Sequence, residues 1–193
     1  MKKIAADEKQ TGLSKTWLLV VVGFSAAAFL VRWAGLVIPV IGAEINIDPR
    51  EIFVTLGAAL TGPLGGAVIG FFAGLSSVTI VFGLSDIIPH IIGGLLIGLL
   101  YKPVHRRWRM PILLLGWVCL LAAYYYVLLI PSSIVTMLLT EPGRLLEVFG
   151  ANLSFSELYI LMAQGAFPEV VGTFIITAII LIALPDKYRR PLW

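Results

Sequence analysis

Residues 48–70, DPREIFVTLGAALTGPLGGAVIG, decide the fold of this chain. They hold a short apolar run, Ile52–Thr61, between Asp-Pro-Arg-Glu on one side and Thr-Gly-Pro on the other. Counted from Pro49, the run makes about 13 helical residues, or roughly 20 Å at 1.5 Å per residue. Whether this short helix crosses a bilayer sets the side on which every later segment lies.

The composition places the chain in a membrane. Of its 193 residues, 59% are apolar and 13% are charged, and the mean hydropathy is +0.98. A soluble core of this size cannot bury so much apolar surface beneath so few charges. An ordinary soluble enzyme, a disordered chain and a fibrous repeat are thereby excluded. The apolar runs are continuous rather than alternating, which favours helices over a β-barrel.

We predict an all-α, polytopic membrane protein with six transmembrane helices in a single domain, residues 1–193. Residues 1–16 form a polar tail and 185–193 a basic tail. Cys119 is the single cysteine, so no internal disulfide forms. The six expected helices are Trp17–Ile38, Ile52–Thr61, Leu64–Phe82, Ile87–Tyr101, Pro111–Met137 and Leu158–Leu184.

Basic residues indicate the orientation. They gather in the N-terminal tail, in the segment 102–109 and at the C-terminus. Lysine and arginine favour the cytoplasmic side of a membrane. All three regions fall on that side only if the short helix crosses, so we expect both termini in the cytoplasm. The residues concerned are Lys2, Lys3, Lys9, Lys15, Lys102, Arg106, Arg107, Arg109, Lys187, Arg189 and Arg190.

The three outward connections, Ile41–Glu51, Gly83–Asp86 and Leu138–Glu157, hold most of the other polar residues. In the first, Asp48 and Glu51 fit the N-cap and N3 positions of a capping box. Helix capping gives Arg50 no role. Its side chain could form an ion pair with an acidic residue or bind an anion.

Ionisable residues inside the apolar runs are costly and point to function. Arg32 either snorkels beside Trp33 or faces a wet cavity and pairs with a substrate anion. Glu169, near the middle of the last helix, either makes a buried hydrogen bond or serves a ligand or proton relay. Tyr125 belongs to the run Tyr124–Tyr126. It either packs and forms hydrogen bonds between helices, or its ring stacks against a flat ligand.

Small residues recur at spacings of four, which allow helices to approach closely. Gly66, Gly70 and Gly74 fit packing within the bundle, as do Gly94 and Gly98. Gly23 and Ala27, on the first helix, are our candidates for docking to another membrane protein.

No phosphate-cradling loop, HExxH or GxSxG motif and no cysteine–histidine cluster occurs in the sequence. We therefore expect no enzyme, no cofactor and no metal site. An intramembrane enzyme would have to rest on Glu169 and His90 alone.

The stretch Asp48–Gly70, followed by Pro89 and by GGLLIG at 93–98, resembles the substrate-binding S components of energy-coupling factor (ECF) transporters. The resemblance implies six helices, cytoplasmic termini and an outward-facing pocket for a vitamin or another scarce micronutrient. It also implies docking through helix 1 on a membrane coupling protein driven by two cytoplasmic ATPases. We expect residence in the plasma membrane of a prokaryotic cell and no nucleic-acid partner.

The same Gly-Pro-x-x-Gly hairpin also resembles the sensing membrane domain of LytS-type histidine kinases, so a sensor or an assembly protein without transport is the alternative. For the transporter subunit we expect a pocket built from the outer helix ends. Its candidate ligands to the substrate are Arg32, Arg50, Asp86, His90, Tyr125, Asn152, Glu157 and Gln164.

Overall fold

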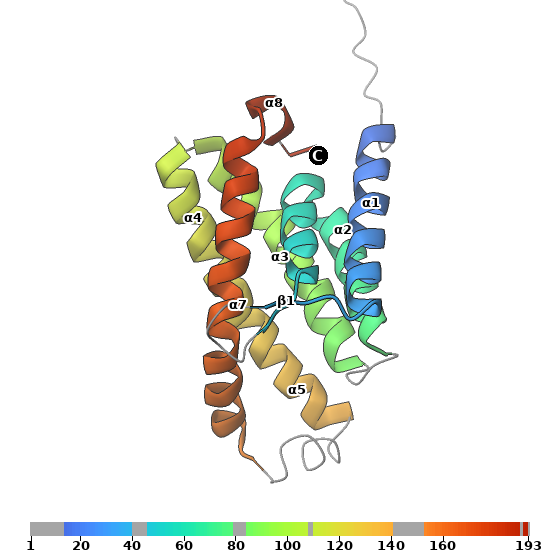
Figure 1. The fold of residues 1–193 in the computed structure, drawn as a ribbon, viewed down its shortest axis with the longest axis vertical. Helices are drawn as coiled ribbons and strands as arrows, with labels where there is room; N and C mark the ends of the chain where they lie inside the picture. The colour runs from blue at the N-terminus through green and yellow to red at the C-terminus, as the bar shows by residue number, and fades with distance from the viewer. Residues whose placement is uncertain are drawn as a thin grey trace, which may run out of the picture.

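The computed structural model describes residues 14–39, 46–78, 84–107, 110–140, 153–189 and 191–192. The described chain is helical apart from one strand pair, in which Ile38 faces Ile47 in antiparallel register. Figure 1 shows the helices running roughly along one axis, with α1 and α7 on opposite sides of the bundle. The elements are α1 (Lys15–Trp33), β1 (Ile38–Pro39), β2 (Asn46–Ile47), α2 (Arg50–Val78), α3 (Leu84–Arg107), α4 (Met110–Ala122), the π-helix η1 (Ala123–Leu129), α5 (Ile130–Thr140), α7 (Phe155–Ala183) and α8 (Asp186–Arg189).

Within the residues that the structure describes, five helical stretches are long and apolar enough to cross a membrane. This confirms the prediction of an all-α, multi-pass membrane protein. The sequence did not predict the strand pair. The five stretches are Lys15–Trp33, Arg50–Ser76, Leu84–His105, Met110–Thr140 and Phe155–Ala183.

The second stretch, α2, folds back on itself at Gly62. That residue has φ 79° and ψ −171°, a conformation that residues with a side chain rarely adopt, and Pro63 follows it. The half before Gly62 lies beside the half after it, because Arg50 Nη1 donates to the carbonyl of Ala73 at 3.1 Å. The expected helices Ile52–Thr61 and Leu64–Phe82 therefore correspond to the two halves of α2, although residues 79–82 lie outside the described part.

Glycines bring α2 and α3 into backbone contact. A Cβ on Gly66 would collide with the backbone of Gly94, and one on Gly98 would collide with Gly62. Gly70 lies in the same way against the carbonyl of His90. These glycines thus pack within the bundle, as their spacing predicted, and they hold α3 against the second half of α2.

One end of the bundle collects the basic segments. Trp17, near the start of α1, donates its indole N–H to the carbonyl of Thr61 at 2.7 Å. The amide of Leu192 donates to the carbonyl of Leu60 at 2.8 Å. The hydroxyl of Tyr101 donates to the carbonyl of Arg189 at 3.5 Å. The start of α1, the end of α3 and the C-terminal segment therefore share this end, which is uppermost in Figure 1.

Between α4 and α5, the helix runs as a π-helix for seven residues, η1. The amide of Ile130 donates to the carbonyl of Tyr125, five residues back. Tyr124 and Tyr125 are both 1% exposed although they are adjacent in a helix. The π-helix thus directs two consecutive tyrosines into the interior.

Candidate functional site

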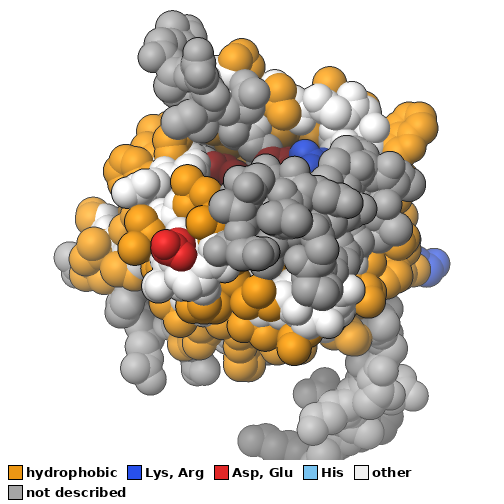
Figure 2. Space-filling view, turned by 90° about the horizontal axis from the view of Figure 1, so that it is seen from below, with side chains coloured by type: hydrophobic (Ala, Val, Ile, Leu, Met, Phe, Trp, Pro, Cys, Tyr) orange, Lys and Arg blue, Asp and Glu red, His pale blue; other side chains and the backbone are white. Residues whose placement is uncertain are grey.

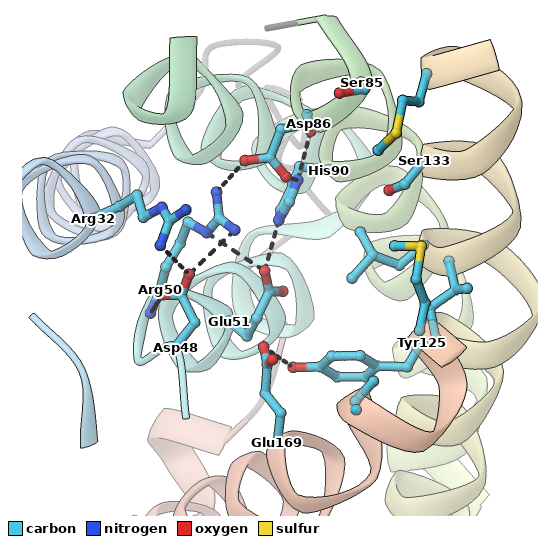
Figure 3. Close-up of a pocket in the computed structure, with 16 residues that line it drawn as sticks. Arg32, Asp48, Arg50, Glu51, Ser85, Asp86, His90, Tyr125, Ser133 and Glu169 are labelled. Atoms are coloured by element: carbon cyan, nitrogen blue, oxygen red, sulfur yellow. Dashed lines mark hydrogen bonds and ion pairs between the residues drawn. The ribbon is translucent and has the colours of Figure 1, made fainter. Parts of the chain in front are cut away.

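A cavity of about 300 Å³ opens near the end of the bundle opposite the basic segments. Figure 2 looks onto this end and shows acidic and basic side chains recessed among apolar ones. In Figure 3 the charged residues from α1, α2 and α3 form one wall, and η1, α5 and α7 form the other. The volume is at the lower end of the range for small-molecule sites.

Arg50, in the first turn of α2, is at the centre of the charged wall. Its side chain is 8% exposed. Its Nη1 lies 2.5 Å from Asp86 Oδ2, and its Nη2 lies 3.2 Å from Asp48 Oδ2. Its Nε is 3.6 Å from Glu51 Oε1. A guanidinium presents several donors in a fixed plane, so one Arg50 joins three carboxylates from two helices and the segment before α2.

Glu51 and His90 form a buried pair behind Arg50. His90 Nε2 lies 2.6 Å from Glu51 Oε1, and His90 Nδ1 lies 2.6 Å from the carbonyl oxygen of Asp86. The hydroxyl of Tyr124 donates to the other oxygen of Glu51 at 2.7 Å. Both carboxylate oxygens of Glu51 are therefore engaged in the interior.

This arrangement corrects the expected capping box. Asp48 does cap α2, because the amide of Arg50 donates to its Oδ1 at 2.9 Å. Glu51, however, turns inward to His90 and Tyr124 rather than back toward the cap. A buried carboxylate gains more from two charge-assisted partners than an exposed cap would give it.

Arg32 extends the charged wall to α1. Its Nη1 lies 3.6 Å from Asp48 Oδ2, and its side chain is 22% exposed. Arg32 thus lines the cavity, as one of the two alternatives expected, but the carboxylate that it pairs with belongs to the protein itself. Its pairing with a substrate anion stays a prediction.

The second wall is mainly apolar. Leu129, Ile130, Met137, Met162 and Ala166 line it. Methionine side chains are flexible and polarizable, so this wall adapts to the shape of an apolar group. Ser133 adds a hydroxyl on the same side.

Glu169 and Tyr125 lie where the two walls meet. The hydroxyl of Tyr125 lies 3.3 Å from Glu169 Oε1 and 3.3 Å from Thr173 Oγ1. Figure 3 shows Glu169 rising from α7 toward the cavity and Tyr125 approaching it from η1. Glu169 thus accepts a hydrogen bond from a neighbouring helix and also lines the cavity. Its role toward a ligand or a proton stays a prediction.

The structure brings five of the eight predicted ligands together in the cavity wall: Arg32, Arg50, Asp86, His90 and Tyr125. Glu157 and Gln164 are exposed and do not line the cavity. Glu157 instead closes a capping box with Ser154 at the start of α7. Asn152 lies outside the described residues.

Sequence reasoning omitted four polar residues of the wall: Asp48, Glu51, Ser85 and Ser133. For Asp48 and Glu51, the capping pattern offered a sufficient structural explanation, which concealed their place in the site. Ser85 precedes Asp86, and Ser133 follows Tyr125 by about two helical turns. The signal that could have identified Ser85 and Ser133 was their spacing in sequence from Asp86 and Tyr125, which were already candidate ligands.

In the part of the chain that the structure describes, no group of three or more histidine, cysteine, aspartate or glutamate side chains is arranged to hold a metal ion. The chemistry of this wall is ionic pairing and hydrogen bonding. Comparison of the chain with protein-family models, with curated proteins and with solved structures finds no match.

Proposed function

We propose that this chain is the substrate-capture membrane subunit of an ECF-type uptake transporter for a vitamin or another micronutrient. The observation that carries the proposal is the cavity of about 300 Å³ with its ionic wall. Charged side chains inside an apolar helix bundle cost several kcal/mol unless they pair or line a wet cavity. Here they do both, which is typical of a binding site for a polar solute.

The proposal includes six membrane passes, with the two halves of α2 as the second and third. The first half, Arg50–Thr61, is only about 18 Å long. It is shielded by protein, since Glu51, Val54, Thr55 and Ala58 are each 1% exposed or less. A short helix buried in this way tolerates ends that do not reach the bilayer surface.

The shared end of the basic segments supports an orientation. Lys15, Lys102 and Arg189 belong to segments that meet at one end of the bundle, and lysine and arginine favour the cytoplasm. With both termini cytoplasmic, the cavity opens outward. An uptake subunit that captures a scarce solute needs that orientation.

The exposed face of α1 supports docking on a membrane coupling protein that works with two cytoplasmic ATPases. A Cβ on Gly23 would meet nothing within 4 Å, so this glycine serves no close packing inside the described chain. Leu19 and Val22 beside it are 73% and 56% exposed. Together with Ala27 they give a surface on which a second helix could approach closely.

Replacement of Ala27 by tryptophan is expected to leave substrate binding intact and to abolish uptake, because the bulky ring separates the two helices. Binding to purified protein and uptake by cells with the full transporter are the two measurements. Ile179→Trp, on the exposed face of α7, is the matched control and should leave both unchanged. Normal uptake by Ala27→Trp would refute this docking face.

Native mass spectrometry of the detergent-purified protein tests the proposed function directly. A stoichiometric small molecule that is retained by the wild type and lost in Ser133→Trp, whose ring would fill the cavity, at unchanged yield of monodisperse protein, would support capture. Retention of the same molecule by Ser133→Trp would show that it binds elsewhere and would count against the site.

A further inference from the structure

The charges of the described cavity wall balance almost completely. Arg32 and Arg50 face Asp48 and Asp86, so two guanidiniums meet two carboxylates. Charges buried in a bundle are stable only when compensated in this way. This part of the wall therefore requires no charge from a ligand.

His90 and Glu51 add no net charge. The carbonyl oxygen of Asp86 is only an acceptor, so His90 Nδ1 must carry a proton to donate to it. The second proton lies between His90 Nε2 and Glu51 Oε1, which are 2.6 Å apart. On either atom, that proton leaves the pair neutral as a whole.

After these charges are paired, Glu169 is the one carboxyl of the described cavity wall that has not been assigned a partner charge. Among the described residues, no ion pair joins it to a basic side chain, and its hydrogen bond to Tyr125 is 3.3 Å long. It lines the cavity at the edge of the apolar wall formed by residues such as Met162 and Ala166. The site thus offers one acidic group without a cationic partner next to an adaptable apolar surface.

We propose that the ligand of this site is a small organic cation, a protonated amine or a cationic heterocycle with an apolar body, and that its positive group pairs with Glu169. The aromatic ring of Tyr125 adds a second surface that attracts a cation. The apolar body lies against the methionine-containing wall, and Ser133 receives a polar substituent. This inference rests on the proposed function and adds the class of substrate.

Three probes of nearly equal size test the charge of the ligand: benzylamine as its ammonium ion, benzyl alcohol and benzoate. Their dissociation constants are measured at millimolar concentrations on the full-length protein in detergent, by thermal shift and by saturation-transfer NMR. Benzylammonium should bind best. Glu169→Gln, which keeps size and hydrogen bonding, should weaken benzylammonium by about tenfold or more and leave benzyl alcohol unchanged.

Glu157→Gln is the matched control, since it removes a carboxyl from the same helix outside the cavity. It should leave all three affinities unchanged. Stronger binding of benzoate or benzyl alcohol, or equal loss in both variants, would overturn the inference while leaving a small-molecule site in place. Binding of none of the three probes would count against both the inference and the proposed function.

Discussion

Arg50 shows how one side chain can organise a buried polar site. It contacts Asp48, Glu51 and Asp86, as well as the carbonyl of Ala73. The benefit of such a cluster depends on all its members, because removal of the cation leaves several negative charges in a low-dielectric interior. Arg50 is therefore as much a structural residue as a candidate ligand.

We expect Arg50→Ala to lower the free energy of unfolding by about 3–5 kcal/mol, since it breaks a buried ion cluster. Arg32→Ala should cost about 1 kcal/mol or less, because Arg32 is more exposed and lies farther from Asp48. Denaturation in detergent, followed by circular dichroism, measures both. Equal losses in the two variants would contradict this difference.

The sequence predicted the site in part at this scale. Polar residues in apolar segments are expensive, so Arg32 and Tyr125 stood out. Asp86 and His90 stood out because they lie in or beside an outward connection. The structure places all four around one cavity. The direction of Glu51 could not be predicted, because a capping carboxylate and a buried one occupy the same position in sequence. Only the tertiary neighbours, His90 and Tyr124, distinguish the two.

At the scale of elements, the contact between α2 and α3 is made by backbone rather than by interlocking side chains. Gly66 and Gly94 face each other so closely that a methyl group on either would strike a carbonyl. Shape complementarity of this kind replaces the hydrophobic effect, which does not drive association of helices within lipid. The position of His90 in the site depends on this contact.

Two glycine-to-alanine changes in helix interiors should have opposite effects. Gly94→Ala should destabilise by about 1–3 kcal/mol, because the helices must move apart. Gly23→Ala should stabilise by about 0.5–1 kcal/mol, because its surroundings are open and alanine favours a helix. Thermal unfolding in detergent distinguishes them, and a change of the same sign in both would refute this packing.

The interruption of α2 at Gly62-Pro63 and the short helix before it were predicted from the sequence, since both depend on local backbone preferences. The π-helix and the strand pair Ile38–Pro39 with Asn46–Ile47 were not. A π-helix shares the apolar composition of the α-helix around it. Two-residue strands are too short to produce an alternating pattern.

At the scale of the whole molecule, the fold-back of α2 predicts sidedness. In a background with Cys119→Ala, a membrane-impermeant maleimide added to intact cells should label Ser156→Cys and spare Lys15→Cys and Lys102→Cys. In inverted vesicles the pattern should reverse. A permeant maleimide should label all three and serves as the control.

If α2 crossed the membrane only once, Lys15→Cys and Lys102→Cys would be labelled from opposite sides. The sequence predicted their common side from charge alone, because three separate basic clusters constrain the topology together. The enclosed volume of the cavity could not be predicted in the same way. It depends on side chains from six helical elements, α1, α2, α3, η1, α5 and α7, whose rotations about their axes no local pattern specifies.

The π-helix η1 sets the rotational phase of α5 relative to α4. Loss of one residue there would restore an unbroken α-helix with its hydrogen bonds intact, and would turn every later side chain by about 100°. Ser133 and Met137 would then leave the cavity while the core around Trp117 stayed in place. A single-codon deletion in η1 would therefore exchange the part of the apolar wall that α5 supplies in one evolutionary step, with the scaffold unchanged.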